Sequence, residues 1–184
     1  AWRTGIYLTP LSTALAPPEV ARLIEHCDAR LVLADGPLPA LLSGLPARVD
    51  PAAGPIRWLC LGGALDGFEA LEPLLAQASA VPAADEPPGA LMMTTSGTTG
   101  APKGVIRPLL PPDWRGTPPF AADLIALFGV GGRDVRYLST APLYHAAPLR
   151  FALAVTAGGG CVHVMDRFDA DEALALLVRE RITH

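Results

Sequence analysis

Residues 93–105 constrain the fold of this chain most strongly, because apolar segments there enclose a turn crowded with hydroxyl side chains. Between Thr94 and Gly104 the chain carries five hydroxyl side chains, three glycines and one lysine. Glycine lets the backbone approach a ligand closely, and successive free N–H groups in such a turn form an anion-binding concavity. The apolar entry at 90–93 and exit at 105–106 predict a loop between two buried strands, suited to gripping a polyphosphate.

Two well-known loops with similar composition do not match this stretch. A Walker loop has Gly directly before its Lys and Ser or Thr directly after it, whereas Pro102 precedes Lys103 and Gly104 follows. This argues against a P-loop ATPase or kinase. A hydrolase nucleophile elbow needs Gly two residues to either side of its Ser, and Ser96 has threonines at both positions. Composition alone leaves open an ordinary surface loop rich in Ser, Thr and Gly.

The segment 95–104, Thr-Ser-Gly-Thr-Thr-Gly-Ala-Pro-Lys-Gly, resembles the phosphate-loop motif of the adenylate-forming superfamily. That superfamily includes acyl-CoA synthetases, aryl-CoA ligases, luciferases and the adenylation domains of peptide synthetases. The motif spans these ten positions, with one free slot at Ala101. The resemblance gives Lys103 a catalytic role, either neutralising phosphate charge or steadying the loop. It implies that ATP is bound by Thr95, Ser96, Gly97, Thr98, Thr99, Gly100, Lys103 and Gly104.

Composition and charge are typical of a globular chain that acts on small molecules. The 184 residues are 51% hydrophobic and 17% charged, which excludes intrinsic disorder. A net charge of −4 without a basic cluster argues against nucleic acid as a partner. No stretch has the roughly 20 apolar residues of a membrane span, and the first residues lack the apolar core of a signal peptide. We therefore expect a soluble, cytoplasmic protein, with its oligomeric state left open.

The cysteines and scattered histidines offer no convincing metal site. Cys27, Cys60 and Cys161 are an odd number of widely spaced thiols, which we expect to be free and buried in a reducing compartment. Cys161 and His163 would share one face of a strand, but no further ligand accompanies them, and His163 is expected to be a core histidine. His26 is expected to be solvated on the polar face of a helix.

The apolar pattern predicts an α/β fold of mostly parallel sheets flanked by helices. In the first half we expect a buried strand at 5–10, a helix opening at Pro17, a strand at 30–34, a helical turn at 40–42 and a strand at 56–61. Short connections join the first three elements, so they form a strand–helix–strand unit with parallel pairing and a right-handed crossover.

The second half repeats the alternation of strand and helix. We expect a helix at 120–128, a strand at 136–141, a buried helix from Pro148 to Ala157, a strand at 161–165 and a helix capped by Asp169. The last helix is expected to turn Ala170, Ala173, Leu174 and Leu177 inward. The segments are 1–89, 90–108 with the phosphate loop, and 109–184. The resemblance makes 1–184 an incomplete portion of an adenylate-forming N-terminal domain, and both ends look cut from a longer protein.

A second group of candidate residues lies in the segment 142–145, Pro-Leu-Tyr-His, directly after a predicted strand. Ligands of open α/β sheets bind beyond the carboxyl ends of the strands, although a plain turn with an aromatic anchor is the simpler interpretation. Acyl-CoA synthetases carry a similar segment at this distance after the phosphate loop. The resemblance places His145, a catalytic candidate, beside the acyl carboxylate and Tyr144 in the acyl pocket. No acidic residue lies between Asp134 and Asp166 to pair with a substrate amine, so a plain carboxylic acid is favoured.

The resemblance therefore implies ATP-dependent activation of a carboxylic acid, expected to be a fatty acid, to an acyl-adenylate and then to a coenzyme A thioester. ATP, Mg²⁺ and coenzyme A are the expected cofactors. The family's magnesium glutamate, ribose-binding aspartate and C-terminal catalytic lysine are not found in this sequence, so the chain alone is expected to be inactive. Two alternatives stay open: a non-catalytic nucleotide-binding remnant, and an adenylation domain that delivers acyl groups to a carrier protein.

Overall fold

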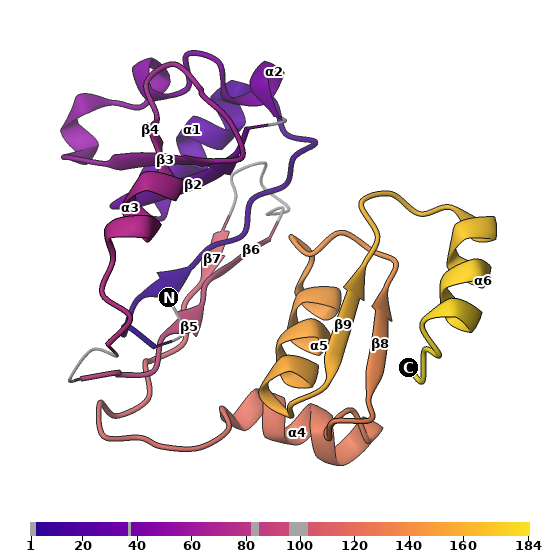
Figure 1. Ribbon diagram of the computed structural model, residues 1–184. Coiled ribbons are helices and arrows are strands. Elements are labelled where there is room, and N and C mark those ends of the chain that lie inside the picture. Colours follow the sequence, from indigo (N-terminus) through magenta and orange to yellow (C-terminus); the bar gives the residue numbers. More distant parts are fainter. Residues whose placement is uncertain (1–2, 37, 82–84, 96–102) are drawn as a thin grey trace. The chain divides into compact units, whose positions relative to one another are not determined.

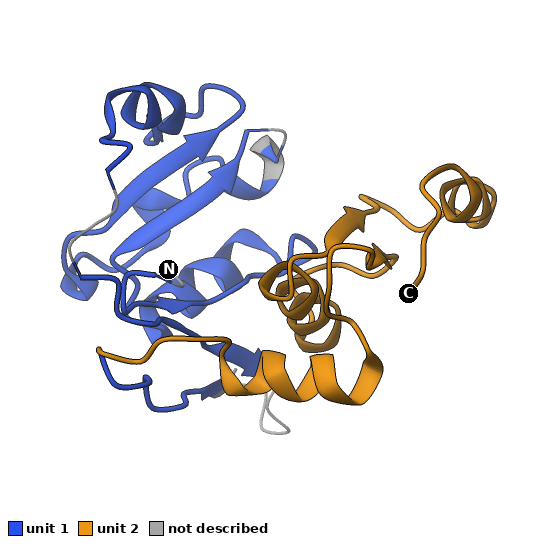
Figure 2. Ribbon diagram, turned by 60° about the horizontal axis from the view of Figure 1, so that its bottom comes forward, with its two compact units in different colours: residues 1–112 blue, residues 113–184 orange. Residues whose placement is uncertain are grey.

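The computed structural model describes residues 3–36, 38–81, 85–95 and 103–184 (Figure 1). The chain divides into two compact units, Ala1–Pro112 and Asp113–His184, coloured blue and orange in Figure 2. Helices alternate with short, mostly parallel strand pairs, so the predicted α/β class is confirmed. Among the described residues, no helix is both long enough and apolar enough to cross a bilayer.

The main sheet of the first unit has three parallel strands in the order β2-β3-β4. Strand β2 (Leu31–Asp35) pairs along its whole length with β3 (Arg57–Leu61), and β3 pairs with the short β4 (Glu69–Ala70). Helix α3 (Leu71–Gln77) follows directly. The predicted strands at 30–34 and 56–61 are thus confirmed to within a residue at each end.

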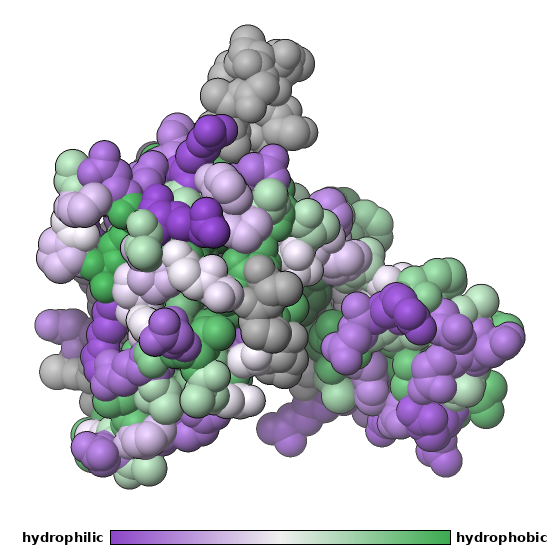
Figure 3. All heavy atoms as spheres, turned by 90° about the horizontal axis from the view of Figure 1, so that it is seen from above, coloured by the Kyte–Doolittle hydropathy of each residue, from purple (hydrophilic) through white to green (hydrophobic). Residues whose placement is uncertain are grey.

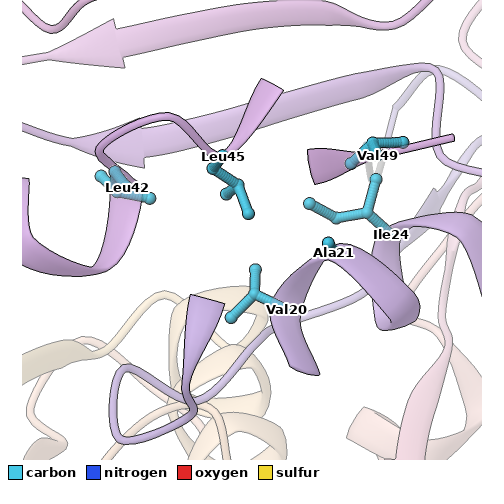
Figure 4. Packing of buried hydrophobic residues seen from close by; sticks show 6 residues of the cluster. All are labelled: Val20, Ala21, Ile24, Leu42, Leu45 and Val49. Atoms are coloured by element: carbon cyan, nitrogen blue, oxygen red, sulfur yellow. The ribbon is translucent and has the colours of Figure 1, made fainter. Parts of the chain in front are cut away.

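Helix α1 (Pro17–His26) provides one wall of the core of this unit. Two prolines open it, where the missing N–H groups have no helical partner to lose. Its buried face packs against the segment that contains α2 (Pro39–Leu42) and the 3₁₀ helices η1 (Pro46–Arg48) and η2 (Pro51–Ala53). Figure 4 shows the side chains of this cluster pointing toward one another: Val20, Ala21, Ile24, Leu42, Leu45 and Val49.

The predicted strand–helix–strand unit around α1 is wrong in its pairing. Strand β1 (Tyr7–Leu8) pairs in parallel with β5 (Ala90–Leu91), whereas β2 belongs to a different sheet. The prediction that β1 is buried is also wrong, because Tyr7 and Leu8 are both exposed. Short connections predict that consecutive strands lie next to each other in space. Which strand each one hydrogen-bonds to, however, also depends on segments far away in the sequence.

The second unit does contain the predicted strand–helix–strand arrangement. Strand β8 (Arg136–Ser139), helix α5 (Ala146–Ala157) and strand β9 (Cys161–Val164) follow one another, and the two strands pair in parallel. Helix α4 (Pro119–Phe128) packs against α5 and ends at Gly129, whose φ of 67° is readily adopted by glycine. The core here consists of Ala121, Val130, Val135, Ala154 and Val155.

Helix α6 (Ala170–Arg179) begins as predicted, because the Asp169 carboxylate accepts a hydrogen bond of 2.9 Å from the Glu172 amide. The predicted inward face is wrong. No residue of α6 is buried, and Leu174 and Leu177 are exposed. Apolar residues are also exposed elsewhere, and hydrophobic and hydrophilic residues intermingle over the described surface drawn in Figure 3.

Candidate functional site

The phosphate-loop stretch begins and ends in an antiparallel strand pair. Strand β6 (Met93–Thr95) pairs with β7 (Lys103–Val105), and the register places the backbone of Thr95 opposite that of Lys103. The prediction of two flanking strands is confirmed. Their predicted burial is only partly right: Met92 is buried, but Val105 and Ile106 are 47% and 61% exposed.

Most of the predicted nucleotide-binding residues lie outside the described part of the chain. These are Ser96, Gly97, Thr98, Thr99 and Gly100. The structure describes the backbone of Thr95 and Lys103, at the two ends of the loop, and the position of Gly104 in β7. The assignment of all these residues to ATP therefore stays a prediction.

Gly104 makes a hydrogen bond that the sequence did not predict. Its amide donates a hydrogen bond of 3.4 Å to Nε2 of His26, at the end of α1. A Cβ at Gly104 would collide with the methyl group of Met92, so only glycine fits beneath that side chain without rearrangement. His26 is exposed, as expected, but it is not only solvated.

Two further contacts hold the strands that lead into and out of the loop. The Tyr7 hydroxyl donates to the Arg107 carbonyl at 2.7 Å, two residues after β7 ends. The Met92 amide donates to the Leu8 carbonyl at 3.0 Å, just before β6 begins. Strand β1 therefore contacts both sides of the loop stretch. Nothing in the hydrophobic periodicity indicated these roles for Tyr7 or His26, because both depend on pairing between distant segments.

Tyr144 and His145 lie in the turn between β8 and α5, beyond the carboxyl end of a parallel strand. The turn is closed by a hydrogen bond of 3.1 Å from the His145 amide to the Pro142 carbonyl. Their rings are 4.6 Å apart, centre to centre. Tyr144 is half-buried and His145 is exposed.

His145 is the N-cap residue of α5, which begins two residues before the predicted start at Pro148. Its carbonyl accepts a hydrogen bond of 3.3 Å from the Leu149 amide, whereas its imidazole forms no cap hydrogen bond. The ring is thus left available at a position where ligands of α/β sheets bind. The assignment of Tyr144 and His145 to an acyl substrate remains a prediction.

The thiols differ more in exposure than the sequence predicted. Cys60 is buried, but Cys27 is half-buried and Cys161 is exposed, so burial was predicted correctly only for Cys60. Burial raises the pKa of the Cys27 thiol, and a hydrogen bond with Thr9 partly opposes that effect. His163 is half-buried and its Nε2 lies 3.5 Å from Cys161 Sγ. Within the described ranges, no group of three or more potential metal ligands occurs.

The pKa values of two carboxylates are lowered, each by a different interaction. The Gly62 amide donates a hydrogen bond of 2.6 Å to Glu72, which lowers the pKa of that carboxyl. The Arg179 guanidinium donates to Glu180 at 3.0 Å and is the main cause of the lowered pKa of Glu180. Both groups lie away from the predicted site residues in the sequence, and neither is assigned a catalytic role.

Comparison with known proteins identifies one family. The whole chain, residues 1–184, matches the AMP-binding enzyme family. A long-chain-fatty-acid–CoA ligase, FadD13 of Mycobacterium tuberculosis, is 29% identical over 99% of this chain and 34% of its own length. A 2-succinylbenzoate–CoA ligase of Staphylococcus aureus is 28% identical over 100% of this chain and 38% of its own length.

Solved structures agree with the sequence matches. The inhibitor-bound N-terminal domain of FACL13 from Mycobacterium tuberculosis has a TM-score of 0.72 at 27% identity, over 96% of this chain and 42% of that one. The amide bond synthetase McbA from Marinactinospora thermotolerans has a TM-score of 0.67 at 26% identity, over 97% of this chain and 34% of that one. The chain thus spans little more than a third of the length of the curated relatives.

Proposed function

This chain belongs to the AMP-binding enzyme family, and from that premise we propose that it supplies the phosphate loop and part of the acyl site of an acid–thiol ligase. The proposed reaction activates a carboxylic acid with ATP to an acyl-adenylate and then transfers the acyl group to coenzyme A. The chain spans little more than a third of the length of its curated relatives, and we propose that it does not turn over alone. Acyl-CoA ligases among its relatives support this choice.

One observation carries the proposal: strands β6 and β7 join the two ends of the loop, with Thr95 and Lys103 in register. In the sequence, the hydroxyl-rich and glycine-rich residues 96–102 lie between these two paired strands. Hydroxyl and amide donors together with one ammonium suit the oxygens of a polyphosphate. The donor set therefore fits ATP.

The loop residues would act by binding and by neutralising charge. Thr95, Ser96, Thr98 and Thr99 would donate hydrogen bonds to the β- and γ-phosphates, while Gly97 and Gly100 allow the backbone to come close. Lys103 would balance the phosphate charge. When bound, ATP supplies the electrophilic α-phosphorus and the AMP leaving group. No residue of this chain is proposed as a ligand of Mg²⁺.

Tyr144 and His145 would bind the acid. The exposed imidazole of His145 would hold the carboxylate, and the half-buried ring of Tyr144 would line the acyl pocket. The segment from Val135 to Met165 contains no carboxylate to pair with a substrate amine. A plain carboxylic acid therefore fits better than an amino acid, and a fatty acid is our choice because it is the substrate class named for FadD13.

ATP binding is testable with unusual specificity because Lys103 is the sole lysine of the chain. An amine-reactive reagent therefore labels only Lys103 and the α-amino group. ATP should protect Lys103 and leave the α-amino group unprotected, as measured by peptide mass spectrometry. Lys103→Ala should weaken ATP binding by about tenfold or more, as expected for loss of a charged contact, while Lys103→Arg should retain most of it. Equal labelling with and without ATP would refute the assignment of Lys103.

The acid and the catalytic competence are tested by ATP–pyrophosphate exchange. The assay uses a panel of a long-chain fatty acid, an aryl acid such as 2-succinylbenzoate, and an amino acid. The 184-residue chain should show no exchange with any of them. A longer protein containing it should respond to the fatty acid first. Robust exchange by the chain alone would show that the missing motifs are not required.

A further inference from the structure

The hydrogen bond between His26 and Gly104 joins two segments 78 residues apart in the sequence. Gly104 directly follows Lys103, where β7 begins, and His26 is the last residue of α1. The donor is a backbone amide, so the bond fixes the main chain of β7 itself. A side chain on α1 is therefore linked directly to the backbone of the strand next to the loop.

The side chains of Met92 and His26 both lie next to Gly104. The Met92 methyl group occupies the space that a Cβ would need, and Nε2 of His26 lies 3.8 Å from that same position. Any residue other than glycine at 104 would require the flexible end of the Met92 side chain to shift, whereas it would be in ordinary van der Waals contact with His26. Packing against Met92 therefore favours glycine at position 104, in addition to any close approach of a ligand.

Helix α1 is buried along one face, whereas β7 is a short strand that pairs with β6. Four residues of α1 are buried: Val20, Ala21, Leu23 and Ile24. By contrast, β7 has three residues, and Val105 within it and Ile106 after it are exposed. Short strands with exposed residues are among the less stable parts of a fold, so a further hydrogen bond to a buried helix helps to hold this strand in place.

We propose that His26 is a positioning residue for the phosphate loop: by accepting the Gly104 amide hydrogen it fixes β7 and, through it, the backbone of Lys103. This inference rests on the proposed function, since it gives the loop an anchor for ATP binding. Accepting the bond requires Nε2 without a proton, which places the proton of the neutral ring on Nδ1. His26 touches no substrate in this role.

The test compares three variants of His26 in the full 184-residue chain. His26→Gln keeps an acceptor near the reach of Nε2, His26→Asn places one near Nδ1, and His26→Ala removes both. Hydrogen exchange of the Gly104 amide, followed by NMR, should be about 2- to 10-fold faster in the Asn and Ala variants and close to wild type in the Gln variant. Arg22→Ala, one helical turn earlier on α1, is the control and should change nothing.

ATP affinity provides the functional measurement. It should fall by about 2- to 10-fold in the Asn and Ala variants and recover in the Gln variant. Two results would overturn the inference. One is hydrogen exchange of the Gly104 amide that is unchanged in all three variants. The other is an ATP affinity equal to that of the wild type in a variant whose Gly104 amide exchanges faster. A wild-type chain that binds no ATP refutes the proposed function itself, which separates the two failures.

Discussion

The segments β1-α1-β2 and β8-α5-β9 follow the same sequence pattern of strand, helix and strand, yet they fold differently. In the second unit the two strands pair with each other, from Arg136 opposite Cys161 to Ser139 opposite Val164. In the first unit β1 pairs with β5 and β2 pairs with β3, so the helix joins two different sheets. The same local pattern therefore supports two topologies.

The difference lies in what each helix packs against. Helix α5 places Ala154 and Val155 in a core with Val130 and Val135, which lie just before β8. The helix therefore packs against the pair of strands that flank it in the sequence. Helix α1 packs instead on Leu42, Leu45 and Val49, which lie after β2. A helix that finds its core partners further along the chain does not bring its two flanking strands together.

Cross-linking should show the largest contrast. Arg136→Cys places a second thiol opposite the native Cys161 in the parallel pair and should give a disulfide in nearly all molecules. Paired strands are about 4.8 Å apart, within the limit of about 7 Å for two Cα atoms in a disulfide. Leu8→Cys with Leu91→Cys should behave likewise.

The matched negative variant is Leu8→Cys with Leu33→Cys, which joins β1 to β2. It should give no intramolecular disulfide, because these strands belong to different sheets. Peptide mapping by mass spectrometry under mild oxidation distinguishes the products from links to the native cysteines. A high yield of the link between positions 8 and 33 would restore the strand–helix–strand unit that the sequence predicted.

Truncation in the two cores should have the next largest effect. Leu45 and Val155 are both 0% exposed, one in each core. Leu45→Ala should lower the free energy of unfolding by about 2–5 kcal/mol, and Val155→Ala, which loses fewer carbons, by about 2 kcal/mol. Val178→Ala, at an 81% exposed position on α6, should change it by less than about 0.5 kcal/mol. Urea denaturation measures the free energy of unfolding of all three variants. A loss for Val178→Ala as large as that for Val155→Ala would contradict the exposure of α6.

The helix ends give a smaller contrast. Helix α4 ends at Gly129 in the left-handed region, whereas α1 ends at Cys27 in a right-handed conformation. Gly129→Ala should cost about 1 kcal/mol through backbone strain alone, since no atom lies near the added methyl group. Gly129→Asn should cost less, because asparagine tolerates this region. Thermal unfolding of the two variants compares them, and equal stability of the Ala variant and wild type would contradict the conformation at 129.

The smallest effect concerns the two perturbed carboxylates, one in each unit. Both folded pKa values lie below the ordinary value of 4.5, so each carboxylate contributes stability above that pH, and the contribution is lost as the pH falls through the folded value. Glu180 depends mainly on a guanidinium and Glu72 on a backbone amide.

Salt should therefore separate the two carboxylates. Raising NaCl from about 0.05 M to about 1 M should move the pKa of Glu180 toward its ordinary value and leave that of Glu72 nearly unchanged. Titration followed by carboxyl NMR signals measures both, and Arg179→Ala should abolish most of the shift at Glu180. An equal response of the two carboxylates to salt would mean that their causes are not distinct.

Local sequence information was sufficient for many of the helices and strands and for the family. The proline pair that opens α1, the capping by Asp169 and Gly129 after α4 act over a few residues, so they were predictable from neighbouring positions. The loop motif at 95–104 likewise indicated the family from contiguous residues, and the match of residues 1–184 to the AMP-binding enzyme family confirmed it.

The partners of strands and the exposure of apolar faces were decided only by the tertiary structure. Neither the pairing of β1 with β5 nor the exposure of Leu174 on α6 follows from periodicity, since a pattern marks an apolar face without saying what covers it. The contact of His26 with Gly104 was hidden for the same reason. A hydrogen bond between residues 78 positions apart depends on how the intervening chain folds back, and that is a property of packing alone.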